Sequence, residues 1–136
     1  MIHITKNTAN TVTLTLTEKT TVSPVSYVIE FKNDETNVKS YVLLGSNLST
    51  QTQRYDKFTI TETTTPNDLD AEIELTRGDY EYQVYETDAD VSAWAAASDV
   101  TSDGTVIEIG KARCHDTEAT NTTYTGATST NVVYEG

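Results

Sequence analysis

The sequence predicts an all-β protein built as a sandwich of antiparallel strands, and three features of its 136 residues lead to that prediction. Apolar residues recur at every second position in several short segments, which is the period of a strand with one buried face. Threonine fills 27 positions, and its β-branched, polar side chain suits the solvent-facing side of a strand. Turn-forming residues separate the segments, and no amphipathic helix of appreciable length interrupts them.

The first half of the chain contains three such segments. Residues 10–17, NTVTLTLT, place a valine and two leucines on one face and threonines on the other. Residues 26–34 and 38–45 alternate around the turn-like sequence KNDETN, so we expect them to form a hairpin. The second member of this hairpin carries apolar residues on both faces, and both faces are therefore expected to be partly covered.

The middle of the chain continues with strand-like segments at residues 56–63 and 70–86. The second of these divides at Arg77-Gly78-Asp79 into two strands of matched alternation, joined as a hairpin or as a corner of the sandwich. Glycine supplies the backbone freedom that such a corner needs, which also accounts for this integrin-like tripeptide without an adhesive role.

An alanine-rich stretch around Trp94 then breaks the pattern. Its spacing predicts one or two helical turns within Asp90 to Ser98, too short to stand alone and docked over an open end of the sheets. Residues 104–114 return to strand alternation. Gly110 inside that run predicts a bulge or the close approach of another backbone.

Three tyrosines, Tyr80, Tyr82 and Tyr85, follow the glycine corner. In immunoglobulin-like sandwiches a tyrosine near the start of a strand bonds through its hydroxyl to the backbone a few residues upstream. Tyr80 stands in that position, and Tyr82 is expected to point inward. Tyr85 shares its face with polar residues and is the better candidate for an exposed contact. The sequence therefore predicts an immunoglobulin-like antiparallel β-sandwich of about seven to nine strands.

We expect a single domain in which residues 1–113 form the β-sandwich. Residues 114–136 are polar and small until a terminal NVVYEG, and they predict an extended C-terminal arm or last strand. The N-terminal residues around His3 are expected to be a flexible start. A chain of this length can bury roughly two thirds of the surface that its unfolded form exposes, so neither a disulfide nor a metal is needed to hold it together.

Charge and composition exclude several classes of function. The formal net charge is −12 and the sequence pI is about 4.3, so the chain is expected to bind neither nucleic acid nor an anionic membrane surface. No signal peptide is visible, and no apolar run approaches the roughly 18 residues of a membrane helix. The one cysteine, Cys114, has no partner for an internal disulfide and fits a reducing cytoplasm.

Few residues are arranged for catalysis. Cys114 and His115 are neighbours in sequence, so on a strand their side chains point to opposite faces and do not form a nucleophile and base. A small hydrolase is therefore the weakest of the alternatives. The aspartates around the alanine-rich stretch do not follow the spacing of a calcium loop. We expect no enzymatic activity and no cofactor.

Three segments carry a resemblance to a known group of proteins: RYDKFTI at 54–60, LTRGDYEYQVYE at 75–86 and VIEIGKAR at 106–113. They resemble small structural proteins of tailed bacteriophages of gut Bacteroidetes, including the crAss-like group. The resemblance implies an auxiliary or decoration protein on the capsid, or the capsid-bound part of a head fibre. It implies the major capsid protein and other virion proteins as partners, and a location on the capsid surface after synthesis in the bacterial host cytoplasm. A homo-oligomer is compatible with it.

Two non-enzymatic readings of the sequence follow from this resemblance. In the first, the protein attaches to the capsid through the arm, with Val132, Val133 and Tyr134 as contacts together with Trp94 and Tyr85. In the second, it is a receptor- or carbohydrate-binding module on a phage tail or fibre that uses Tyr41, Tyr85 or Trp94 as stacking surfaces.

Overall fold

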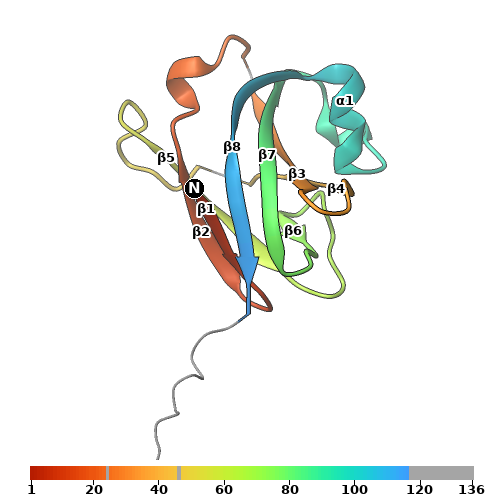
Figure 1. The fold of residues 1–136 in the computed structure, drawn as a ribbon. Helices are drawn as coiled ribbons and strands as arrows, with labels where there is room; N and C mark the ends of the chain where they lie inside the picture. Colours follow the sequence, from red (N-terminus) through yellow and green to blue (C-terminus); the bar gives the residue numbers. More distant parts are fainter. Residues whose placement is uncertain (24, 46, 117–136) are drawn as a thin grey trace, which may run out of the picture.

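Two β-sheets packed face to face make up the part of the chain that the computed structural model describes, residues 1–23, 25–45 and 47–116 (Figure 1). Its strands are β1 Ile2–Thr5, β2 Ala9–Leu14, β3 Ser26–Asn33, β4 Lys39–Leu43, β5 Asp56–Glu62, β6 Glu72–Ile73, β7 Gly78–Thr87 and β8 Thr105–His115. One sheet has the order β1-β8-β7-β3-β4, and the other has the order β2-β5-β6. The predicted all-β sandwich is therefore confirmed.

The main apolar core fills the space between the two sheets. In β2 and β5 every second residue is buried, as the alternation of their sequences predicts. Burial of each large apolar side chain contributes about 1.5 to 3 kcal/mol to folding. The side chains that are essentially inaccessible to solvent come from both sheets and from the segment that follows β2: Ile4, Leu16, Ile29, Phe31, Val42, Phe58, Ile60 and Val84.

Most of the strand order matches that of an immunoglobulin-like domain, except that β6 follows its neighbour β5 in the chain, whereas strand D precedes strand E. Antiparallel pairing joins β8, β7 and β3 as it joins strands G, F and C of such domains, and β2 pairs with β5 as B pairs with E. The predicted hairpin of β3 and β4 is present, with Ile29 opposite Val42. The expectation of a purely antiparallel arrangement is wrong at two places, because β1 pairs parallel to β8 and β6 pairs parallel to β5.

The chain passes from one sheet to the other directly after β1. A tight turn follows the strand, and its Asn7 has a φ of 60°, a left-handed value that asparagine tolerates better than most residues. This turn carries the chain from the edge of one sheet into the other, so β1 lies beside β8 instead of forming a hairpin with β2 (Figure 1). His3 lies within β1 opposite Arg113, and the expected flexible start is therefore wrong.

Residues 74–79 form a corner between the sheets rather than a hairpin. The segment leaves β6 in the three-stranded sheet and enters β7 in the five-stranded sheet, and Gly78 at this point has a φ of 142°, which only glycine adopts readily. Tyr80 is 3% exposed, and its hydroxyl donates a hydrogen bond to the carbonyl oxygen of Thr76 at 2.8 Å. The predicted tyrosine corner is confirmed, as is the inward position of Tyr82.

A glycine is needed in β8 because a side chain, and not another backbone, approaches the strand closely at that position. Gly110 lies opposite Tyr82, and a Cβ at this position would come within 2.5 Å of the Tyr82 ring. The bulge of this strand pair lies elsewhere, between Val84 and Tyr85. The strand itself continues to His115, so two residues assigned to the C-terminal arm belong to the sheet. Asp116 follows the strand, and residues 117–136 of the arm lie outside the described residues.

A second apolar cluster covers the outer face of the five-stranded sheet. The alanine-rich stretch forms 3-10 turns at Val91–Ala93 and Ala97–Asp99, followed by the short helix α1, Val100–Asp103. These turns pack on the sheet face and not over an open end, which corrects the expected position. The reason is that Val28 of β3 points outward and requires cover, which Ala97 and Val100 provide.

Both ends of β5 carry a buried carboxylate. Asp56 is inaccessible to solvent and accepts hydrogen bonds from the backbone N–H groups of Leu16, at 2.6 Å, and Thr17, at 2.8 Å. Glu62 is 1% exposed and accepts from the backbone N–H of Leu75 at 3.0 Å, from that of Asn7 at 2.8 Å and from the Lys6 ammonium at 3.0 Å. Each carboxylate therefore joins β5 to segments distant in sequence.

These hydrogen bonds set the acid stability of the fold. Burial by itself raises the pKa of each carboxyl, but the bonds outweigh it and hold the pKa values of Asp56 and Glu62 below their ordinary 3.8 and 4.5. A group whose pKa is lower in the folded state stabilises the protein above its unfolded-state pKa. That contribution disappears as the pH falls through the folded-state value.

We therefore expect the free energy of unfolding to be nearly constant around neutral pH and to fall steeply below about pH 4. Urea denaturation followed by circular dichroism at a series of pH values measures this. Glu62→Gln is expected to flatten the acid limb, whereas Glu18→Gln, at an exposed site, serves as the control and is expected to leave it unchanged. Equal acid limbs in Glu62→Gln and the parent chain would contradict the assignment.

Candidate functional site

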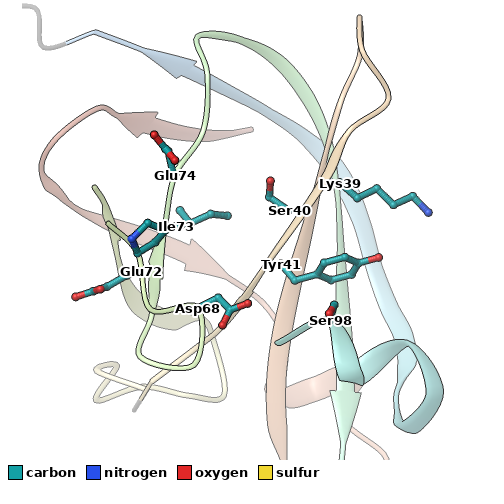
Figure 2. A pocket seen from close by; sticks show the side chains of 9 residues that line it. Lys39, Ser40, Tyr41, Asp68, Glu72, Ile73, Glu74 and Ser98 are labelled. Atoms are coloured by element: carbon teal, nitrogen blue, oxygen red, sulfur yellow. The ribbon is translucent and has the colours of Figure 1, made fainter. Parts of the chain in front are cut away.

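The open side of the sandwich lies between β4, the edge of the larger sheet, and β6, the edge of the smaller one. Two hollows of about 540 and 400 Å³ adjoin there and share Ser40 and Glu74. We call the combined space the β4–β6 groove, and Figure 2 shows the side chains that line the hollow of about 540 Å³. Its lining consists of Asn33, Thr36, Val38, Lys39, Ser40, Tyr41, Pro66, Asp68, Glu72, Ile73, Glu74, Leu75, Thr76, Tyr80 and Ser98.

The backbone of β4 presents unpaired groups to this groove. In an antiparallel pair, every second residue of a strand forms hydrogen bonds with the partner strand. Val38 and Leu44 both bond to β3, so the even-numbered residues between them also bond to β3. Lys39, Tyr41 and Leu43 consequently direct their N–H and C=O groups away from β3. The Leu43 N–H donates to the carbonyl oxygen of Asp68 at 2.8 Å, whereas those of Lys39 and Tyr41 have no partner among the described residues.

The groove is acidic. Figure 2 shows the carboxylates of Asp68 and Glu74 beside it, while Glu72 points away from β4 at its rim. The Lys39 side chain extends away from residues 72–74 in the same view. Within the described part of the chain none of these charged groups forms an ion pair. Three carboxylates and one lysine line the groove, so its net charge is negative.

Three aromatic residues that the sequence suggested as contacts are brought together by the fold. Tyr41, Tyr85 and Trp94 come from β4, β7 and the 3-10 turns, and all three pack against the outer-face cluster. Tyr85 is half-buried instead of exposed, because the turns cover the sheet face on which it lies. Trp94 is also half-buried, and its Nε1 donates to Oδ2 of Asp103 at 3.1 Å.

The polar ends of the two tyrosines meet at one buried carboxylate. Glu30 of β3 is 3% exposed, and its Oε1 accepts a hydrogen bond from the Tyr85 hydroxyl at 3.0 Å. Burial, together with this hydrogen bond and the carboxylate charge, raises the pKa of Tyr85 to about 12. Burial and the same charge raise the pKa of Tyr41. The Tyr85 hydroxyl therefore stays protonated at neutral pH and donates to Glu30, while the Tyr41 hydroxyl lies within reach of the same charge.

The adjacent Cys114 and His115 lie on opposite faces of β8, as the sequence predicts for neighbours on a strand. The Cys114 side chain is 2% exposed, and its Sγ lies 4.0 Å from the carbonyl oxygen of Leu75 in the core. The His115 ring lies against His3 on the other face, with 5.9 Å between the ring centroids. Burial raises the pKa of the Cys114 thiol, which opposes formation of a thiolate nucleophile.

Two kinds of site can be assessed for the described residues alone. No set of three or more histidine, cysteine, aspartate or glutamate side chains is grouped there to bind a metal ion. No helix in the same residues is both long and apolar enough to span a membrane. The arm contacts suggested by the sequence, Val132, Val133 and Tyr134, lie outside the described residues.

Comparison of the chain with protein-family models, with curated proteins and with solved structures gives no match. The candidate site is therefore argued from its own geometry. The sequence identified Tyr41, Tyr85 and Trp94 but missed the edge of β4, Glu30 and the groove carboxylates Asp68 and Glu74. A glutamate at residue 30 on a face that also carries Val28 was the available signal for a buried carboxylate.

The environment of Cys114 yields a simple chemical test. We expect the thiol to react slowly with a disulfide reagent in the native protein and rapidly in denaturant, because the side chain is buried and its pKa is raised. A matched control carries the exposed substitution Thr50→Cys together with Cys114→Ala, and should react at once in the native state. Rapid reaction of native Cys114 would revive the nucleophile interpretation.

Proposed function

We propose that the protein is a non-enzymatic structural component of a tailed bacteriophage virion. In this proposal it is an auxiliary or decoration protein on the capsid surface that stabilises the shell or anchors head fibres. It is made in the bacterial host cytoplasm and binds the major capsid protein and other virion proteins. The resemblance of residues 54–60, 75–86 and 106–113 to small phage structural proteins supports the virion assignment.

The observation that carries a binding role is the open edge of β4. An unpaired strand edge is a template for another chain, and natural proteins usually cover it, shorten it or interrupt it. Here the backbone groups of Lys39 and Tyr41 face a groove and have no partner within the described residues. A protein partner that completes the sheet explains why this edge is left open.

The charge of the chain supports the same proposal. Aspartate and glutamate total 21 against 9 lysines and arginines. Such an excess favours attachment to a basic surface and keeps copies of the chain apart until they attach. The proposed contacts Val132, Val133 and Tyr134 of the arm would add an apolar component to that attachment.

Imaging of intact phage particles tests the proposal directly. We expect density for this chain at regular lattice positions on the capsid shell, and we expect purified protein to bind particles that lack it. Binding should weaken at high salt because exposed charges are screened. A chain that ends at Asp116 retains every described strand and should bind less well, since the proposed arm contacts are removed. Density confined to the tail, or no density on the particle, would overturn a capsid role.

The alternative is a receptor- or carbohydrate-binding module on a tail or fibre. The clustering of Tyr41, Tyr85 and Trp94 favours it, because aromatic rings are common stacking surfaces. Two features weaken it. All three rings are half-buried in the outer-face cluster, and the Tyr85 hydroxyl is already bonded to Glu30.

The two functions differ in their response to glycans. If the capsid proposal holds, a glycan array probed with the folded protein is expected to stay blank, with folding confirmed by circular dichroism on the same sample. Binding that disappears in Trp94→Ala but persists in Tyr55→Ala, which removes an aromatic ring outside the cluster, would establish the alternative.

A further inference from the structure

We propose that the β4–β6 groove binds an extended segment of a partner protein that carries lysine or arginine, and that this segment joins β4 as an added strand. The inference deepens the proposed function and rests on it only in taking the chain to bind other proteins. Three independent features of the groove lead to it: its backbone, its charge and its exposed apolar side chain.

The backbone of β4 supplies the pairing groups. Lys39 and Tyr41 are two residues apart, which is the repeat at which one edge of a strand presents its N–H and C=O groups. An added strand would lie about 4.8 Å from β4, in the space that the groove occupies. The hollow of about 540 Å³ is lined by both residues, and the hollow of about 400 Å³ continues from it along β4.

The far end of the open edge is already capped. The Leu43 N–H bonds to Asp68 O, so pairing stops at that residue and the added strand is limited to the segment beside Lys39 and Tyr41. Residues 74–76 form the opposite wall of the groove. Two hydrogen bonds fix this wall: the Leu75 N–H donates to the Glu62 carboxylate, and the Tyr80 hydroxyl donates to the carbonyl oxygen of Thr76. The groove is therefore preformed, which lowers the ordering cost of binding.

Charge selects the kind of segment. Asp68 and Glu74 flank the groove, Glu72 lies at its rim, and none of them forms an ion pair within the described residues. Lysine or arginine on one face of the added strand would neutralise them. Val38, an apolar side chain at the other end of the groove, is 61% exposed and offers a contact for an apolar residue of the partner.

Charge also disfavours two other possible occupants of the groove. Residues 117–136 of this chain contain two glutamates and no lysine or arginine, so they do not complement the carboxylates. A second copy of the protein brings a further net charge of −12 toward an acidic surface. A basic segment of a different protein is the occupant that the electrostatics favour.

The first test is binding of the full-length chain to a short fluorescent peptide in which lysine alternates with threonine and valine. We expect measurable affinity at low ionic strength, and none for the same peptide with glutamate in place of lysine. Glu74→Lys is expected to weaken binding by at least about fivefold. Glu18→Lys makes the same change in net charge at an exposed site away from the groove, and is expected to stay within about twofold. Equal effects of the two substitutions would overturn a site in the groove.

The second test separates strand addition from charge alone. Lys39→Pro removes one outward N–H and is tolerated on an edge strand, whereas Lys39→Thr retains it. Both remove a positive charge, so simple electrostatics predicts tighter binding of the basic peptide by both. Strand addition predicts that Lys39→Pro loses binding by about tenfold or more while Lys39→Thr does not. Similar affinities in the two variants would overturn strand addition.

Hydrogen exchange of the Lys39 and Tyr41 amides identifies the occupant. The proposal predicts rapid exchange in the free chain and protection on peptide binding. Protection that rises with protein concentration would assign the groove to a second copy. Protection in the dilute full chain that disappears in the chain ending at Asp116 would assign it to residues 117–136. Either result overturns the proposal. If the chain is found on the capsid but does not bind the peptide, this inference fails and the proposed function stands. If it binds the peptide but is absent from the capsid, the proposed function fails and this inference stands.

Discussion

The hydrogen bonds of the two carboxylates at the ends of β5 are the interactions on which the rest of the structure depends. A buried charge is costly unless it is paired or richly hydrogen-bonded. Asp56 is richly hydrogen-bonded, and Glu62 is in addition paired with Lys6. Asp56 accepts from Thr17, Leu16 and Asn47, while Glu62 accepts from Asn7, Leu75 and Lys6. Among the described residues the smaller sheet has three strands, and one of them has two residues. These hydrogen bonds therefore supply cross-links that a longer strand ladder would otherwise provide.

The same bonds shape the groove. Because β6 ends at Ile73, residues 74–76 have no strand partner among the described residues, and other contacts must hold them in place. Glu62 holds Leu75 from within the core, and the Tyr80 hydroxyl holds Thr76 at the corner. The wall therefore stays apart from the edge strand. The groove is a consequence of two sheets of unequal width closed by buried polar contacts.

Local sequence predicted the features that depend on neighbouring residues. The alternation of β2 and β5, the hairpin of β3 and β4, and the corner at Tyr80 each arise from short-range chemistry, and each is present. The burial of Asp56 and Glu62 was also visible in principle. Both lie on the same face of β5 as Phe58 and Ile60, which point inward. A charged side chain at such a position is nevertheless predicted to be exposed unless its hydrogen-bonding partners are known.

Features set by distant segments could not be predicted in this way. The parallel pairing of β1 with β8 joins residues more than a hundred positions apart, and nothing in either strand specifies its partner. The cover over Val28 required knowing that the alanine-rich turns reach the outer face. The open edge of β4 was hidden for the same reason, since an edge strand is defined by what does not pair with it.

Strand addition and charge make different contributions to the proposed recognition. Backbone hydrogen bonds to Lys39 and Tyr41 would favour any extended chain, so they provide affinity with little discrimination. Discrimination must come from side chains, and here it falls to Asp68 and Glu74, with Val38 at the far end of the groove. Exposed carboxylates act partly at long range and are screened by salt. The negative field would thus speed the approach of a basic segment, while the edge of β4 would determine how long it stays bound.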